Sequence, residues 1–342
     1  MLTISLNITI AFKYGFIKEK EFISLVYISG FIIVIFGLLQ VVAHKVGIPV
    51  FSLRESHASA LFHESRFSSF FTEPDNCGKF LTVIVLLITP YVFKRELPAL
   101  IYYFLVSGVI LTLTRTAIIG LFGTLMLGVV FAIIYPSFGK RYSHASFLKV
   151  MVTSLVIIFA VAVFFSILKF DEVFYYRIKS ILSLTTSLRE DPSLPPRKLS
   201  IMGALGAILE SDNFLEIVFG KGWGAGFFIS LGFTELYVKG AANLFIMLFL
   251  FSGFIGVFYW ALLLGYSYNV LLKAINSNVV PELALGTAMG LTSSLIFGVL
   301  SSNFISPEFW MLFGIIAYIE LLVKNSYCVV CGNRQLKSKI PE

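Results

Sequence analysis

The chain has 342 residues, of which 58% are hydrophobic and only 13% are charged. Soluble domains carry about 25% charged residues and roughly 45–50% apolar ones, so this composition excludes an ordinary soluble protein, a disordered chain and a disulfide-rich scaffold. The formal net charge is +7, but the basic residues form no stripe of the kind that binds nucleic acid. They lie mostly at the ends of apolar runs, which is typical of a multi-spanning membrane protein.

Apolar runs, taken in chain order, predict the membrane spans. A helix needs about 20 apolar residues to cross roughly 30 Å of hydrocarbon, and the backbone polar groups exclude open strands and loops there. About eight runs qualify, namely 22–42, 77–93, 97–114, 116–136, 149–168, 241–268, 282–300 and 309–323. We expect an all-α integral membrane bundle, a single membrane domain over residues 1–342. The first dozen residues are also apolar and are interpreted as the stub of a further span or as an interfacial segment.

Lysines and arginines in the short loops predict the orientation, because cytoplasmic loops are rich in them. Here they gather in alternate connections, at Lys13, Lys18, Lys20, Lys94, Arg95, Lys140, Arg141, Lys149, Lys273 and within 324–339. An even number of spans then places all of them in the cytoplasm, together with both termini and a tail at 324–342. The other side receives two long extracytoplasmic loops, 43–76 and 169–240.

The segment 169–240 is too polar to span and too long for a plain connection, so we expect it to have a function. Its prolines, Pro192, Pro195 and Pro196, prevent a continuous helix there. Apolar residues at helical spacing then predict an amphipathic helix on the outer membrane surface: Leu199, Met202, Leu205 and Leu209. The glycine-rich stretch 220–226 lacks the strand and the ending of a phosphate loop, so we interpret it as a turn.

Arg115 stands between two apolar runs. An arginine at the bilayer centre costs at least about 2.5–3.5 kcal/mol, so it needs a partner or a water-filled cavity. One interpretation is a turn at the interface, with the guanidinium reaching lipid headgroups. The other is a bidentate donor to an anionic substrate group, for which pyrophosphate is a natural match. Arg177, Arg189 and Arg197 in the long loop are either solvated charges or part of the same site.

Glu73 and Asp75 flank Pro74 at the start of the second run. Carboxylates are favoured at a helix N-terminus, so capping is one interpretation. Glu73 is alternatively a general base that takes a proton from a sugar hydroxyl, or shares a divalent cation with Asp75. Two carboxylates are too few ligands for a metal site, and the histidines and the Cys328–Cys331 pair match no metal motif, so we expect no metal and no other cofactor.

Four stretches together resemble the O-antigen ligase/polymerase superfamily of bacterial polysaccharide polymerases. They are Arg66 to Pro74 before a span, then Leu113-Thr114-Arg115-Thr116, then Pro196-Arg197-Lys198-Leu199 followed by Phe219-Gly220-Lys221-Gly222-Trp223-Gly224, and last Ala242-Asn243-Leu244-Phe245 followed by Ser252-Gly253-Phe254-Ile255-Gly256. Their order is that of the family, and they extend over residues 66–256.

The resemblance implies an integral-membrane glycosyltransferase of the GT-C type that acts on the outer face of the bacterial inner membrane. Its substrates are sugars linked to undecaprenyl pyrophosphate. Arg115 and Arg197 match the arginines that engage the pyrophosphate, and Arg66 and Asn243 match further substrate-binding positions. The family's ligases carry a histidine where this chain has Ala242. That departure weakens a ligase assignment and leaves the general base open, with Glu73 as the candidate.

The resulting hypothesis is a polymerase that joins lipid-linked repeats into O-antigen, capsule or exopolysaccharide. Arg177 and Arg189 are further substrate-binding candidates, and the expected partners are the lipid-linked glycan, the bilayer, a chain-length regulator and a flippase, but no nucleic acid. The alternatives are a ligase that moves finished glycan to another acceptor and a transporter without catalysis. Transporters place ionisable pairs within the membrane, whereas the predicted span interiors contain almost none.

Overall fold

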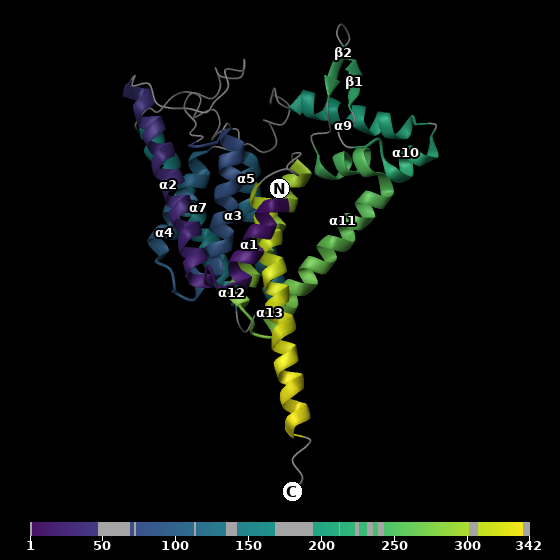
Figure 1. The fold of residues 1–342 in the computed structure, drawn as a ribbon. Helices are drawn as coiled ribbons and strands as arrows, with labels where there is room; N and C mark the ends of the chain where they lie inside the picture. The colour runs from purple at the N-terminus through teal and green to yellow at the C-terminus, as the bar shows by residue number, and fades with distance from the viewer. Residues whose placement is uncertain are drawn as a thin grey trace.

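The computed structural model describes residues 2–46, 69–71, 73–112, 114–134, 142–167, 194–211, 213–222, 226–230, 235–238, 243–300 and 307–337. Most of them are helical (Figure 1). The helices are α1 (Leu2–Lys13), α2 (Glu19–Val46), α3 (Pro74–Phe93), α4 (Ala99–Leu111), α5 (Arg115–Ile134), α7 (His144–Ile167), α9 (Leu194–Leu209), α10 (Phe214–Phe219), α11 (Leu244–Asn276), α12 (Pro281–Leu300) and α13 (Pro307–Lys337).

Six helices of the described chain are long and apolar enough to cross a membrane: Glu19–Ala43, Pro74–Phe93, Arg115–Ile134, Leu244–Asn276, Pro281–Leu300 and Pro307–Ser326. They correspond to six of the predicted runs, and the chain is a multi-pass helical membrane protein. Two predicted spans, 97–114 and 149–168, fall on shorter apolar helices, α4 and the part of α7 up to Ile157. With 13 residues, α4 is only about 20 Å long, which is less than the hydrocarbon thickness.

Helices α3 and α12 form the centre of the bundle and are its most deeply buried spans. They approach closely at Gly286, where an added Cβ would lie under 3.0 Å from the backbone of Leu87. Helix α5 approaches α12 in the same manner, because Gly120 faces the ring of Phe297. Small residues at such contacts allow helix backbones in membranes to pack tightly.

Helix α1 packs along α13. The Ser5 hydroxyl donates to the carbonyl of Trp310, and the Thr9 hydroxyl donates to that of Gly314 over 3.1 Å. These contacts advance along both helices together, so the two run parallel. The first residues of α1 therefore lie toward the start of α13, and the C-terminal end of α13 lies at the other end of the bundle (Figure 1). The sequence had led us to expect both termini on one side of the membrane, whereas the start of α1 and the end of α13 lie at opposite ends of the bundle.

Connections with basic residues meet at one end of the bundle, the lower end in Figure 1, which we call the basic end. Tyr91 donates to Glu19 over 2.6 Å, which joins α3 to the start of α2. Lys94, just after α3, forms an ion pair with Glu282 at the start of α12, and Tyr142 donates to the same carboxylate over 3.2 Å. At the opposite end, which we call the upper end, α3, α5 and α13 begin.

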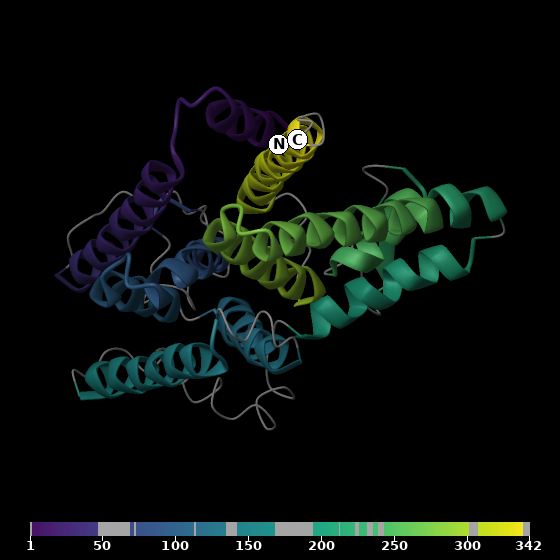
Figure 2. The same cartoon turned by 90° about the horizontal axis from the view of Figure 1, so that it is seen from below.

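Helices α9 and α10 lie across the upper end beside α11 (Figures 1 and 2). A short antiparallel hairpin of β1 (Phe227–Ser230) and β2 (Glu235–Val238) follows them, with Phe227 opposite Val238. This part of the chain has a core of its own, separate from that of the bundle: Ala204, Ile208, Leu244, Met247, Leu248, Leu250 and Phe251. The predicted loop 169–240 thus contains helices α9 and α10 and the hairpin.

The helix predicted after Pro196 corresponds to α9, and most of its predicted apolar row lies outside the face that packs on the protein. Met202 is 58% exposed and Leu209 is 79% exposed. The buried residues of α9 are instead Ser200, Ala204 and Ile208. Small side chains on this face let α9 pack against α11, which leaves the larger apolar side chains on the outside.

Helix α11 is broken at Gly253, which has φ 60° and ψ −160°. The backbone N–H of Lys221 donates to the carbonyl of Leu250 over 2.8 Å, and that of Gly222 donates to Phe251 over 3.0 Å. These bonds satisfy carbonyls that the break removes from the helical pattern. Lys221 and Gly222 therefore have a structural role, and we call their contact with the break the α11 clip.

An ion pair accompanies the α11 clip. Lys221 lies 3.2 Å from a carboxylate oxygen of Glu216, to which Ser211 also donates a hydrogen bond of 2.7 Å. The hydrogen bonds from Ser211 and Lys221 lower the pKa of Glu216. This carboxylate therefore stays ionised beside the clip under ordinary conditions.

Candidate functional site

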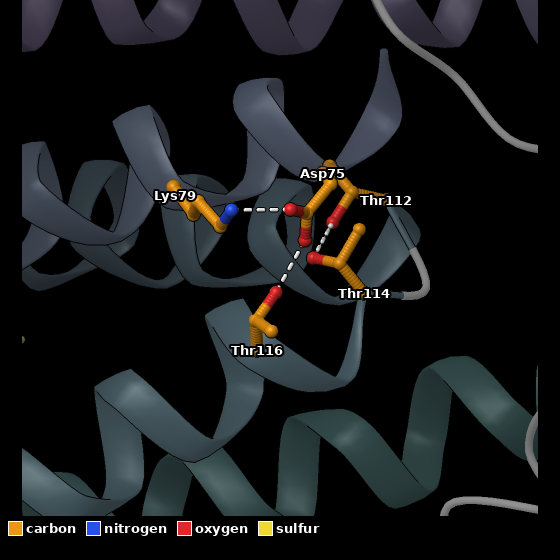
Figure 3. A network of polar contacts seen from close by, with 5 residues as sticks. All are labelled: Asp75, Lys79, Thr112, Thr114 and Thr116. Atoms are coloured by element: carbon orange, nitrogen blue, oxygen red, sulfur yellow. Dashed lines mark hydrogen bonds and ion pairs between the residues drawn. The ribbon is translucent and has the colours of Figure 1, made fainter. Parts of the chain in front are cut away.

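A polar network lies at the upper end, where α3 and α5 begin (Figure 3). Asp75 in the first turn of α3 forms an ion pair with Lys79, one turn further along the same helix. The hydroxyl of Thr116, in the first turn of α5, donates to the other oxygen of Asp75. The side chain of Lys79 is 2% exposed and that of Asp75 is 28% exposed. A lysine among packed membrane helices is costly unless it is paired, so Lys79 depends on this carboxylate.

Threonines in the connection between α4 and α5 complete the network. The hydroxyls of Thr112 and Thr114 share a hydrogen bond of 3.0 Å, and Thr112 also donates to the carbonyl of Val109 over 2.7 Å. Gly78 of α3 faces both hydroxyls, because an added Cβ would lie 2.6 Å from that of Thr112 and closer still to that of Thr114. The connection is therefore held tightly against the first turns of α3.

Arg115 is the first residue of α5 and is partly buried. Its neighbours on both sides, Thr114 and Thr116, are 3% and 7% exposed and belong to the network. The position of Arg115 is thus fixed by the contacts of the residues next to it. Arg115 brings a guanidinium, whose forked donors match the oxygens of an oxyanion, to the start of α5.

Glu73 is the residue that precedes α3, and its backbone carbonyl accepts from the N–H of Cys77 over 3.2 Å. Its side chain is exposed and makes no capping hydrogen bond. The structure places Glu73 at the N-cap position and Asp75 in the first turn, where carboxylates are favoured, but the Glu73 side chain forms no capping hydrogen bond. Pro74 occupies the first helical position, as its fixed φ favours.

Asn243 caps the start of α11. Its side-chain oxygen accepts from the N–H of Phe245 over 2.9 Å and from that of Ile246 over 3.2 Å. Its amide nitrogen donates to the carbonyl of Val299 over 2.8 Å, which ties α11 to the end of α12. The amide predicted to bind substrate is thus engaged at a junction between helices.

The remaining predicted residues fall mostly outside the described part of the chain. Arg66, Arg177 and Arg189 belong to ranges that the structure does not describe. Arg197 lies in the first turn of α9, and its side chain is not among those described. Of the predicted set, the structure brings Arg115 next to the network that surrounds Asp75.

The sequence reasoning missed Lys79. It noted almost no ionisable residues within the spans and did not single out Lys79, which is buried near the start of α3. The signal was present, because Asp75 and Lys79 are four residues apart, the spacing at which opposite charges meet on one helix face. Thr116 follows 41 residues after Asp75, and no local pattern connects the two.

A cavity of about 130 Å³ lies between the two halves of α11, α12 and α13. Its lining is almost wholly apolar: Leu244, Phe245, Leu248, Val257, Trp260, Ala261, Leu264, Leu295 and Phe309. The cavity shares no residue with the Asp75 network and suits hydrocarbon rather than a charged ligand. Within the described ranges, no group of three or more His, Cys, Asp or Glu side chains could hold a metal ion.

The chain was compared with protein-family models, with curated proteins and with solved structures. None of the three comparisons gives a match. A functional assignment therefore depends on the residues at the upper end, on their geometry and on the ordered motifs in the sequence.

Proposed function

We propose that this protein is an integral-membrane glycosyltransferase of the GT-C type that polymerises oligosaccharide repeats linked to undecaprenyl pyrophosphate. The observation that carries the proposal is Arg115, the first residue of α5, which is followed directly by Thr116, the residue that donates to Asp75 of the Asp75–Lys79 pair. A guanidinium is the side chain best matched to a pyrophosphate. The polar residues lie at the end of the bundle, where a lipid headgroup and its glycan can reach them.

The orientation follows from the charges of the connections. Cytoplasmic loops carry the excess of lysine and arginine, so the basic end faces the cytoplasm of a bacterial cell. The upper end then opens on the outer face of the inner membrane. Lipid-linked sugars are suitable donors there, because the leaving group travels with the substrate and no nucleotide sugar is required.

The chemistry requires stabilisation of a departing pyrophosphate. Negative charge grows on the leaving group as the glycosidic bond to it breaks, and fixed cationic donors are worth most against such developing charge. Arg115 supplies one such donor, and Arg66 and Arg197 supply others in this proposal. The loss of a single donor of this kind costs about 2.7–4 kcal/mol, or about 100- to 1,000-fold in rate.

The test is substitution of Arg115 in cells that lack the chromosomal gene. Arg115→Ala is expected to abolish long polymer and to leave single repeats, with an unchanged amount of protein in the membrane. Ser277→Ala, at the basic end, is the control and should restore normal chain length. The measurements are the size distribution of the surface glycan and an immunoblot of the membrane fraction. Normal polymer from the Arg115→Ala protein would contradict the assignment.

Ligase chemistry at the same site is the first alternative. A deletion strain separates the two, because loss of a polymerase leaves single repeats and loss of a ligase leaves long unattached chains. The buried pair of Asp75 and Lys79 favours a second alternative, a transporter, since ionisable pairs within spans often mark transport pathways. Elongation of lipid-linked repeats by the purified protein in vesicles without a gradient would exclude pure transport.

A further inference from the structure

We infer that Asp75 is the group that accepts the proton of the acceptor hydroxyl, with Lys79 and Thr116 as positioning residues for its carboxylate. This inference rests on the proposed function and replaces Glu73, the candidate from the sequence. Three observations carry it: the contacts of the two carboxylates, the burial of Lys79 and the position of Arg115 next to Thr116.

The two carboxylates near the start of α3 differ in how they are held. Both oxygens of Asp75 are engaged, one by Lys79 and the other by Thr116. Glu73 is exposed and makes no capping bond to its own helix. A catalytic group must be kept within a narrow range of positions relative to the reacting atoms. Asp75 meets this condition.

Asp75 also keeps room for a substrate. Each carboxylate oxygen can accept two hydrogen bonds, so one contact on each leaves further capacity. The side chain is 28% exposed, whereas its partner Lys79 is 2% exposed. The pair is therefore closed on the lysine side and open on the carboxylate side, as a base that must reach a hydroxyl requires.

Stability alone does not account for the buried pair. Replacement of a buried ion pair by well-packed apolar residues is often neutral or stabilising. Charges within membrane spans are costly and mark functional sites by default. A buried lysine near the start of α3 is explained if its role is to hold the ionised carboxylate of Asp75 in place.

The acceptor hydroxyl oxygen forms a bond to the anomeric carbon of the donor sugar. The bond between that carbon and the pyrophosphate oxygen breaks, and its electron pair leaves with the pyrophosphate, whose negative charge Arg115 stabilises in the proposed function. The hydroxyl proton passes to a carboxylate oxygen of Asp75 and from there to water. The step needs no oxidant, reductant or cofactor.

The experiment uses the full chain in vesicles and the lipid-linked oligosaccharide that accumulates in cells without the gene. Asp75→Asn is expected to lower the rate of elongation by about 100- to 10,000-fold, the usual contribution of a general base. Asp75→Glu should retain part of the rate, and the control Glu96→Gln, at the basic end, should retain all of it. A large loss in Glu73→Gln with an active Asp75→Asn would return the role to Glu73 and overturn the inference.

Asp75→Asn leaves Lys79 buried without its carboxylate and can therefore unfold the protein. The double variant Asp75→Asn with Lys79→Met removes both charges together, which buried pairs tolerate. We expect it to be folded and inactive. A folded double variant that elongates at the wild-type rate overturns the inference, whereas an inactive wild-type protein overturns the proposed function as well.

The positioning role has its own readout. Thr116→Val should lower kcat without changing KM for the lipid-linked oligosaccharide, and Thr116→Ser, which keeps the hydroxyl, should restore kcat. A purely structural role would change the melting temperature and the yield of Thr116→Val but leave kcat of the folded fraction intact. That result would remove Thr116 from the site.

Discussion

The absence of a side chain at Gly78 is required by the packing at the upper end. It is the point at which α3 meets the hydroxyls of Thr112 and Thr114, and an added Cβ would lie under 3.0 Å from both. Gly78→Ala must therefore push the connection before Arg115 away from α3. We expect a loss of about 1–3 kcal/mol, typical of overpacking, together with a loss of elongation. Thermal unfolding in detergent and the elongation assay measure the two effects.

Gly265→Ala is the matched control for Gly78→Ala. Gly265 lies within α11, and nothing lies within 4 Å of the position of an added Cβ. Alanine is favoured over glycine in a helix by about 1 kcal/mol, so this change should be neutral or stabilising. If Gly78→Ala behaved like the control, the close approach of α3 to the connection would be refuted.

The residues of the candidate site differ in how well the sequence alone predicts them. Arg115 could be identified without a structure, because an arginine between apolar runs stands out. Asp75 and Lys79 could have been paired from their spacing. The bond between Asp75 and Thr116 could not, since it depends on how α3 and α5 pack. The choice between Glu73 and Asp75 needed the same tertiary information, because only contacts show which carboxylate is held.

At the scale of elements, the break in α11 leads to a further prediction. Gly253 has a positive φ, which residues with a side chain rarely adopt. An added Cβ would also lie under 3.0 Å from the backbone of Val218 in α10. Gly253→Ala should therefore separate α10 from α11 and lower stability by at least about 1–3 kcal/mol, the cost of a strained backbone position.

The measurement for Gly253→Ala is the melting temperature of the purified protein, with Gly265→Ala as the control in the same helix. Hydrogen exchange of the Lys221 and Gly222 amides adds a local readout, because both amides donate to α11. These amides should exchange faster in Gly253→Ala than in the control. Unchanged protection would show that the α11 clip does not depend on the break.

Sequence patterns predicted most helices but not their internal form. The prolines and the apolar spacing predicted α9, yet the spacing could not tell which of its faces packs on α11. The run 241–268 predicted one span, and nothing local distinguished Gly253 from a glycine inside a regular helix. The run 97–114 looked long enough to cross the bilayer, but α4 ends at Leu111, and nothing in the apolar run indicated that end.

At the scale of the whole molecule, the orientation can be tested directly. In a chain whose native cysteines are replaced, Lys198→Cys in α9 and Asn276→Cys at the basic end provide two exposed thiols. A membrane-impermeant maleimide applied to intact cells should label the thiol at 198, and the thiol at 276 should be labelled only after permeabilisation. The reverse pattern would place Arg115 on the cytoplasmic side and contradict the proposed use of lipid-linked donors outside the cell.

Helix α3 is attached at both of its ends, through Asp75 to α5 and through Tyr91 and the adjoining Lys94 to α2 and α12. Because both of its ends are bonded to other helices, α3 cannot tilt or slide independently of them. It therefore holds a fixed position for a ligand at the upper end. Helix α9, which packs with α11 in a separate core, and helix α10 lack such anchors to α3 among the described contacts. If the proposed polymerase function holds, displacement that makes way for a lengthening polymer takes place in α9 and α10, while the groups of the proposed site keep their mutual distances.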